Sequence, residues 1–216
     1  MIAAVIFDLD GVLVDSESVW DSVRERITRE SGGRWHEHAQ HDMMGMSSLE
    51  WSRYMHEALG VPMPPEEISA LVVERLMEEY RRHLPLLPGA VEAVRELAVR
   101  WPLGLASSSN RPVIDLVLEL TGLTDRFAAT VSSEEVARGK PAPDVYLETA
   151  RRLEIEPTRC AAIEDSTNGI RSAKAARMFV AVVPRPDFPP APDALELADL
   201  VLDSLVELPT ALDGPG

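Results

Sequence analysis

Two aspartates near the start of the chain, Asp8 and Asp10, have the type and spacing to act together in catalysis or metal binding. They follow an apolar run rich in β-branched residues, Ile2–Phe7. If the chain stays extended past that run, both carboxylates lie on one face, roughly 6–7 Å apart. Carboxylates this close repel, so one needs a cation or a proton. A Mg²⁺ ion on one, with the other left for acid–base work, would resolve the conflict; the alternative is a solvated turn.

Small hydroxyl side chains stand at a second point where an apolar run ends. Ser107, Ser108 and Ser109 follow Leu103–Ala106, and Asn110 after them is an expected helix N-cap. Free backbone N–H groups and a hydroxyl at a helix start can form an anion site. Helix capping alone is the alternative interpretation of these residues.

A lysine and a second pair of acids complete the set. Lys140 is fixed between Gly139 and Pro141 just before an expected helix, where it could neutralise a phosphate or a carboxylate. Glu164 and Asp165 end another apolar run and could complete the oxygen shell of Mg²⁺. The alternatives are a solvated loop lysine and an acidic turn that complements a helix dipole.

Short apolar runs alternate with helical patterns through most of the chain. After Ile2–Phe7, the expected strands are Leu103–Ala106, Phe127–Val131, Cys160–Ile163, Phe179–Val183 and Leu200–Leu202. The expected helices are Ala90–Arg100, Asn110 to Gly122, Asp144–Leu153 and Gly169–Arg177. This alternation predicts an α/β fold built on a doubly wound parallel sheet. Such sheets bind ligands at the carboxyl ends of their strands, which is where these polar residues stand.

The stretch from Asp15 to Leu86 interrupts the alternation with helical periodicity. Apolar residues recur at helical spacing over 19–27, 51–59 and 68–80, and Ser47 with Glu50 has the pattern of a capping box. We therefore expect a helical cap over residues 15–86, inserted into a core of residues 1–14 and 87–216. His36, His38 and His41 are expected in a solvated loop of this cap rather than in a metal site.

The composition excludes several classes of protein. With 216 residues, 45% hydrophobic and 26% charged, the chain is typical of one globular unit. Its net charge of −15 argues against nucleic-acid binding and against docking on anionic lipid. No signal peptide is expected, and no apolar run reaches the ~20 residues of a membrane span. The single cysteine, Cys160, excludes a disulfide framework and indicates a reducing, cytoplasmic setting.

The four polar motifs, in this order, resemble those of the haloacid dehalogenase-like hydrolase superfamily. They are FDLDGVLVDSE, LASSSN, GKPAPDVYL and AIEDSTNGI, and they span the chain from Phe7 to Ile170. The helical insertion resembles the small cap of that family. The chain is most similar to the subgroup of sugar-phosphate phosphatases and β-phosphoglucomutase-like proteins. Two stretches, DSESVWD and SAKAARM, are similar to those of 2-deoxyglucose-6-phosphate and hexitol phosphatases.

The resemblance implies a Mg²⁺-dependent phosphatase that acts on a small sugar or polyol phosphate through an aspartyl-phosphate. By position, Asp8 resembles the nucleophile and Asp10 the general acid/base. Ser107 and the Ser108 backbone resemble the phosphate clamp, and Lys140 the lysine between nucleophile and phosphate. The metal ligands implied are the Asp8 carboxylate, the Asp10 carbonyl, Asp165 and Glu164 beside it. The expected partner is a small phosphate ester; the oligomeric state stays open, with a monomer favoured.

A phosphomutase of the β-phosphoglucomutase type is the main alternative, because it shares all four motifs. The mutases that the chain resembles carry a histidine soon after the first motif and an arginine in a Gly-x-Ser-Arg stretch of the cap. This chain has Trp20 at the first position and Gly45-Met46-Ser47-Ser48 at the second, which favours hydrolysis. A dehalogenase would need neither the second acid nor the metal ligands, and a receiver-type signalling domain would be shorter.

The cap is expected to set substrate specificity. Its candidate substrate-facing residues are Asp15–Trp20, Met43–Ser48 and Trp51, and the run Met43-Met44-Gly45-Met46 could form an apolar lid edge. The alternative for that run is ordinary core packing. Hinges are expected near Val14–Ser16 and Leu84–Gly89.

Overall fold

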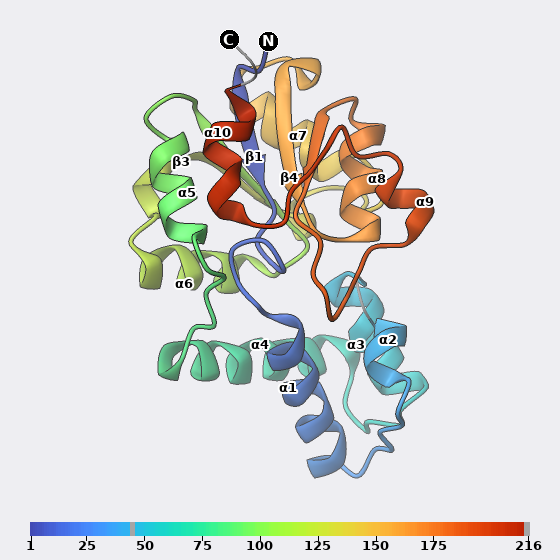
Figure 1. Ribbon diagram of the computed structural model, residues 1–216. Helices are drawn as coiled ribbons and strands as arrows, with labels where there is room; N and C mark the ends of the chain where they lie inside the picture. The colour runs from blue at the N-terminus through green and yellow to red at the C-terminus, as the bar shows by residue number, and fades with distance from the viewer. Residues whose placement is uncertain (44–45, 214–216) are drawn as a thin grey trace.

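A computed structural model of the chain describes residues 1–43 and 46–213 (Figure 1). Six parallel strands form one sheet in the order β3-β2-β1-β4-β5-β6. The strands are β1 (Ala4–Phe7), β2 (Leu103–Ser107), β3 (Phe127–Ser132), β4 (Cys160–Glu164), β5 (Phe179–Val182) and β6 (Leu200–Val201). Each lies close to its expected bounds, and the predicted doubly wound parallel sheet is confirmed.

Helices cover both faces of the sheet because successive side chains of a strand point to opposite faces. On β1, Val5 and Phe7 belong to one buried cluster, and Ala4 and Ile6 to the other. The first cluster includes residues of α5 (Ala90–Leu97), α6 (Arg111–Thr121) and α10 (Leu208–Leu212); the second includes residues of α7 (Asp144–Arg152), α8 (Thr167–Ala175) and α9 (Pro192–Leu195). This burial on both faces explains why β1 and β5 are apolar at every position.

Short 3₁₀ helices lie before β3, after β3, before β4 and before α10. They are η1 (Thr124–Arg126), η2 (Ser133–Glu135), η3 (Pro157–Arg159) and η4 (Leu205–Glu207). In the part of the chain that the structure describes, no helix is both long and apolar enough to span a lipid bilayer.

Four helices inserted between β1 and β2 lie together at the end of the sheet where β1 ends (Figure 1). They are α1 (Glu17–Glu30), α2 (Ala39–Met43), α3 (Ser48–Glu57) and α4 (Pro65–Arg82). The capping box of α3 is present as predicted: the N–H of Ser47 donates to Glu50 Oε2 over 2.8 Å. Helix α2 is not predicted from the sequence, because five residues with two buried side chains carry no periodic pattern.

The chain enters and leaves this group of helices through adjacent segments. The N–H of Asp15 donates to the carbonyl of Pro85 over 2.7 Å, and Val14 pairs with Leu86 in an isolated bridge. These two crossings coincide with the segments expected as hinges. The division into residues 15–86 and the remainder stays a prediction.

Candidate active site

One cleft, of about 310 Å³, lies between the carboxyl ends of the strands and the inserted helices. From the sheet side, Asp8, Asp10, Lys140 and Asp165 line it. The structure thus brings together residues that stand at three separate motifs of the sequence. The volume is within the range of roughly 300–1,000 Å³ that is usual for small-molecule sites.

Lys140 joins two buried carboxylates at this cleft. Its Nζ lies 2.9 Å from Asp8 Oδ1 and 2.6 Å from Glu164 Oε1, and all three residues are buried. Burial alone lowers the pKa of Lys140, but the charges of Asp8 and Glu164 outweigh it and raise that pKa above its ordinary value. Lys140 is therefore a fixed cation directly beside Asp8.

Glu164 is held in place from both of its oxygens. Its Oε1 accepts hydrogen bonds from Lys140 and from the hydroxyl of Tyr146, at 2.7 Å, and its Oε2 accepts from the N–H of Asp165, at 3.2 Å. A Cβ at Gly169 would overlap with this carboxylate, so α8 can approach it only with glycine there. Tyr146 could not be singled out from the sequence, because its helical spacing marks it only as a buried residue.

Three acids lie close enough to share a metal ion. Asp8, Glu164 and Asp165 each offer a carboxylate oxygen, and these oxygens lie within 4.8 Å of one another. Burial and the neighbouring acids raise the pKa of Asp8 to about 8 and that of Asp165 well above its ordinary value. Asp165 Oδ1 is buried and has no hydrogen-bond partner among the described residues. Crowded carboxylate oxygens with an unsatisfied member fit a hard divalent cation such as Mg²⁺.

Asp10 has different surroundings from the acid triad. Its Oδ2 accepts a hydrogen bond of 2.6 Å from Ser109 Oγ, and its Oδ1 accepts one of 3.2 Å from Trp20 Nε1. Ser109 lies after β2 and Trp20 lies on α1. The carboxylate of Asp10 is therefore held from the sheet and from the inserted helices at once.

The loop from β2 to α6 contains the residues predicted to clamp phosphate. Ser107 is fully buried, and its Oγ accepts the N–H of Ser109 over 2.9 Å, while Ser108 lines the cleft. Asn110 is the N-cap of α6, as expected. The predicted roles of Ser107 and Ser108 stay predictions, since the loop is seen here without a ligand.

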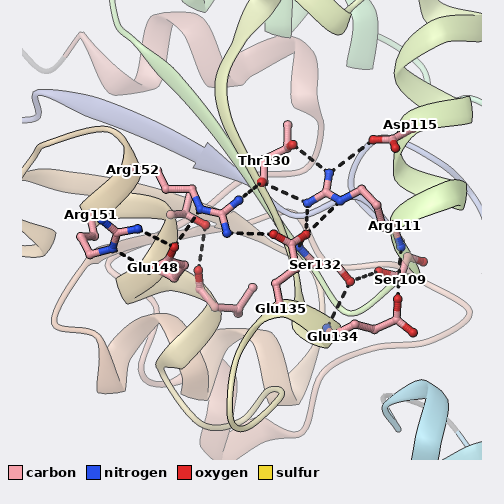
Figure 2. A network of polar contacts seen from close by, with 12 residues as sticks. Ser109, Arg111, Asp115, Thr130, Ser132, Glu134, Glu135, Glu148, Arg151 and Arg152 are labelled. Carbon is pink, nitrogen blue, oxygen red and sulfur yellow. Dashed lines mark hydrogen bonds and ion pairs between the residues drawn. The ribbon is translucent and has the colours of Figure 1, made fainter.

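A network of polar and charged residues holds this loop in place (Figure 2). Ser132 Oγ donates to the carbonyl of Ser109 over 2.7 Å. Arg111 at the start of α6 donates to Glu135 and to Thr130 Oγ1, the latter over 2.9 Å. Glu134 accepts from Asn110 Nδ2 over 2.6 Å. The serine loop is therefore preorganised before any ligand binds.

The helical side of the cleft presents one face of α1. Glu17, Trp20 and Arg24 follow at spacings of three and four residues, and all three line the cleft. Of the other residues expected to face substrate, Met43, Met46 and Trp51 line it, whereas Met44 and Gly45 lie outside the described residues. Asp15 instead pairs with Arg185 of the core over 2.8 Å.

Some residues of the cleft were not predicted. The sequence indicates only that Arg24 belongs to an amphipathic helix. His41 lines the cleft from α2, although it was expected in a solvated loop. Phe188, Pro189 and Pro190 also line the cleft, from the segment between β5 and α9.

Comparisons with known proteins agree with the geometry. Residues 2–177 match the haloacid dehalogenase-like hydrolase family. Hexitol phosphatase B of Escherichia coli (strain K12) is 38% identical over 218 residues, which cover 98% of this chain and 96% of that protein. The crystal structure of CbbY from Rhodobacter sphaeroides in complex with phosphate has a TM-score of 0.85, 27% identity and 96% coverage of both chains.

A β-phosphoglucomutase from Clostridium difficile is also similar, with a TM-score of 0.81 over 96% of this chain and 93% of that one. At 24% identity this likeness shows the fold alone. Together the comparisons confirm the predicted resemblance and the prediction of a phosphoric monoester hydrolase.

Proposed function

The chain belongs to the haloacid dehalogenase-like hydrolase family, and from this premise we propose that it hydrolyses a sugar or polyol phosphate by way of a phosphate carried on Asp8. The observation that carries the proposal is the buried pair of Asp8 and Lys140 in the cleft, with Asp10 two residues further on. The likeness to hexitol phosphatase B supports this class of substrate.

In the first step, a carboxylate oxygen of Asp8 attacks the phosphorus, and the bond from phosphorus to the leaving oxygen breaks. Asp10 donates its proton to that leaving oxygen, so a neutral alcohol departs. Lys140, held 2.9 Å from Asp8, offsets the charge of the phosphoryl oxygens as they approach the carboxylate.

In the second step, water replaces the alcohol. Asp10 takes a proton from the water, whose oxygen attacks the phosphorus, and the bond from phosphorus to Asp8 breaks. Inorganic phosphate leaves, Asp8 is a free carboxylate again, and Asp10 has regained its proton. In this proposal the N–H groups and hydroxyls after β2 hold the phosphoryl oxygens through both steps.

Asp8, Asp165 and Glu164, with the carbonyl of Asp10, would hold Mg²⁺. When bound, the ion supplies positive charge that reduces the repulsion between an anionic nucleophile and an anionic substrate. Glu164 has a second task in this arrangement, because it also fixes Lys140 and Tyr146.

We also infer that residues 15–86 act as a cap over the cleft. Two hydrogen bonds join them to the core at the site: Trp20 Nε1 to Asp10, and Ser48 Oγ to Glu134 Oε1 over 3.0 Å. A closed cap would exclude bulk water, which strengthens the electrostatic contacts of the phosphate.

A phosphate-release assay over a panel of sugar, polyol and nucleotide phosphates, with and without Mg²⁺, tests the proposal. We expect Mg²⁺-dependent release of inorganic phosphate from at least one sugar or polyol phosphate. Asp8→Asn should abolish turnover without lowering the melting temperature, because the nucleophile is lost while a buried charge repulsion is relieved. Measurable turnover by that variant, or isomerisation of a sugar phosphate without free phosphate, would contradict the proposal.

A further inference from the structure

An arginine on the helical side of the cleft is buried without a polar partner. Arg24 of α1 is 7% exposed and lines the cleft. Its Nε–H is fully buried and donates to no acceptor among the described residues, and no ion pair joins Arg24 to a carboxylate there. A buried, unpaired charge is costly to a fold, so its retention at a ligand site points to a partner that arrives with the ligand.

Two indoles hold the guanidinium in place. Its central carbon lies 4.8 Å from the ring centroid of Trp20 and 5.0 Å from that of Trp51. Contacts of this kind fix the plane and position of the cation while leaving its N–H groups free to donate. Trp20 also donates to Asp10, so only one indole separates Arg24 from the proposed acid/base.

The charge around Arg24 argues against a second anion in this part of the cleft. Glu17, two helical turns earlier, lines the same cleft, and the electrostatic influence of Asp10 and Asp21 also reaches Arg24. A substrate with a second phosphate or carboxylate here would meet Glu17 as well as Arg24. A hydroxyl group can accept from Arg24 and donate to Glu17, so a neutral polyol matches both side chains.

We propose that Arg24 is a specificity-determining residue that donates hydrogen bonds to the hydroxyl groups of an uncharged, polyhydroxylated leaving group, with Glu17 accepting from the same hydroxyls. The phosphate of such a substrate lies at Asp8, and its carbon chain extends along α1. This inference rests on the proposed phosphatase function and adds the class of the leaving group to it. The chain lacks the arginine of the mutases' Gly-x-Ser-Arg stretch. Arg24 is a cation on the same helical side of the cleft, but its proposed role is to bind hydroxyl groups.

The test compares Arg24→Met, Arg24→Lys and Glu17→Gln with the wild type, using the full chain and Mg²⁺. Arg29→Met is the matched control, because Arg29 lies on the same helix with an exposed side chain that pairs with Glu25. The substrates are a hexitol monophosphate, p-nitrophenyl phosphate, which has no hydroxyl chain, and a hexose bisphosphate. The decisive quantity is the ratio of kcat/KM for the hexitol monophosphate to kcat/KM for p-nitrophenyl phosphate.

We expect Arg24→Met to lower this ratio by about tenfold or more, mainly through a higher KM for the hexitol monophosphate, as loss of a charged donor implies. Arg24→Lys and Glu17→Gln should lower the ratio by smaller factors, and Arg29→Met should leave it unchanged. If Arg24→Met does not fold, the Arg24→Lys and Glu17→Gln variants decide.

Two results would overturn the inference but not the proposed function. One is an unchanged ratio in the folded variants. The other is a larger loss of kcat/KM with the hexose bisphosphate than with the hexitol monophosphate, which would assign Arg24 to a second anion. A wild type that hydrolyses p-nitrophenyl phosphate but no hexitol monophosphate would also overturn it. Failure of the wild type to release phosphate from any of the three would instead overturn the proposed function, and the inference with it.

Discussion

Asp8 and Asp10 stand two residues apart in the sequence but meet different surroundings. Asp8 lies among buried charges, and burial with the nearby acids raises its pKa to about 8, against the opposing effect of Lys140. Asp10 instead accepts hydrogen bonds from three neutral donors, Ser107, Ser109 and Trp20. Different environments for two carboxylates are the usual way in which a site separates a nucleophile from an acid/base.

This separation predicts a leaving-group effect in Asp10→Asn. The substitution keeps the size of the side chain and removes its proton, so turnover of a sugar phosphate should fall by about 10²–10⁴-fold. Formation of the phosphate on Asp8 should be partly rescued with p-nitrophenyl phosphate, because p-nitrophenolate leaves without a proton. A rapid-quench measurement should then show a burst of p-nitrophenolate followed by slow turnover.

Asp125→Asn is a suitable control for that measurement, because Asp125 is an exposed aspartate of η1, away from the cleft. It should behave as the wild type with both substrates. If Asp10→Asn lowers the turnover of the sugar phosphate and the burst rate with p-nitrophenyl phosphate by the same factor, Asp10 does not act as the acid.

At the scale of elements, the turn after β1 brings two motifs into contact. Gly11 has a φ of +77°, and a Cβ there would overlap with Oδ2 of Asp165. The turn therefore requires glycine for its backbone conformation and again for the close approach of the acid. Gly122, the C-cap of α6, also has a positive φ, of +64°, but open space lies around it.

The two glycines form a matched pair for a test of the metal site. Gly122→Ala should lose about 1–2 kcal/mol of stability, because alanine is strained at positive φ. Gly11→Ala should lose more, because its Cβ would also overlap with Asp165. Only Gly11→Ala should also displace Asp165, so Mg²⁺ should raise the melting temperature of the wild type and of Gly122→Ala but not of Gly11→Ala. Thermal unfolding with MgCl₂ or EDTA measures this. Equal Mg²⁺ shifts in all three proteins would place the ion elsewhere.

The elements that carry the site were predictable because their patterns are local. Short runs of mostly apolar residues predicted the strands, and the residues just past Phe7 and Ile163 were therefore expected to meet at one edge of the sheet. The place of Arg24 on α1 was not predictable in the same way. An amphipathic pattern shows which side chains avoid water, and Arg24 is buried against indoles that come from α1 and α3. Tyr146 and Glu134 likewise depend on contacts between distant segments.

At the scale of the whole molecule, a strongly acidic protein is proposed to bind an anionic substrate. The net charge is −15, yet the cleft holds Lys140 and Arg24 as buried cations. Charges spread over the surface act at long range through water, whereas buried charges act at contact and are screened little by salt. The overall charge and the local site therefore affect different stages of catalysis, namely approach and chemistry.

Ionic strength separates these two stages. With a phosphate dianion, raising the salt concentration from about 10 mM to about 150 mM shortens the Debye length from roughly 30 Å to about 8 Å, which screens the repulsion between substrate and protein. We expect kcat/KM for a sugar phosphate to rise by about two- to fivefold over this range, because approach becomes easier. The value of kcat at saturating substrate should stay constant, since Lys140 acts at contact from a buried position.

The measurement needs a fixed concentration of free Mg²⁺ at every salt concentration. A fall in kcat/KM with added salt would mean that the cations of the cleft, and not the net charge of the molecule, dominate the field that the approaching substrate meets.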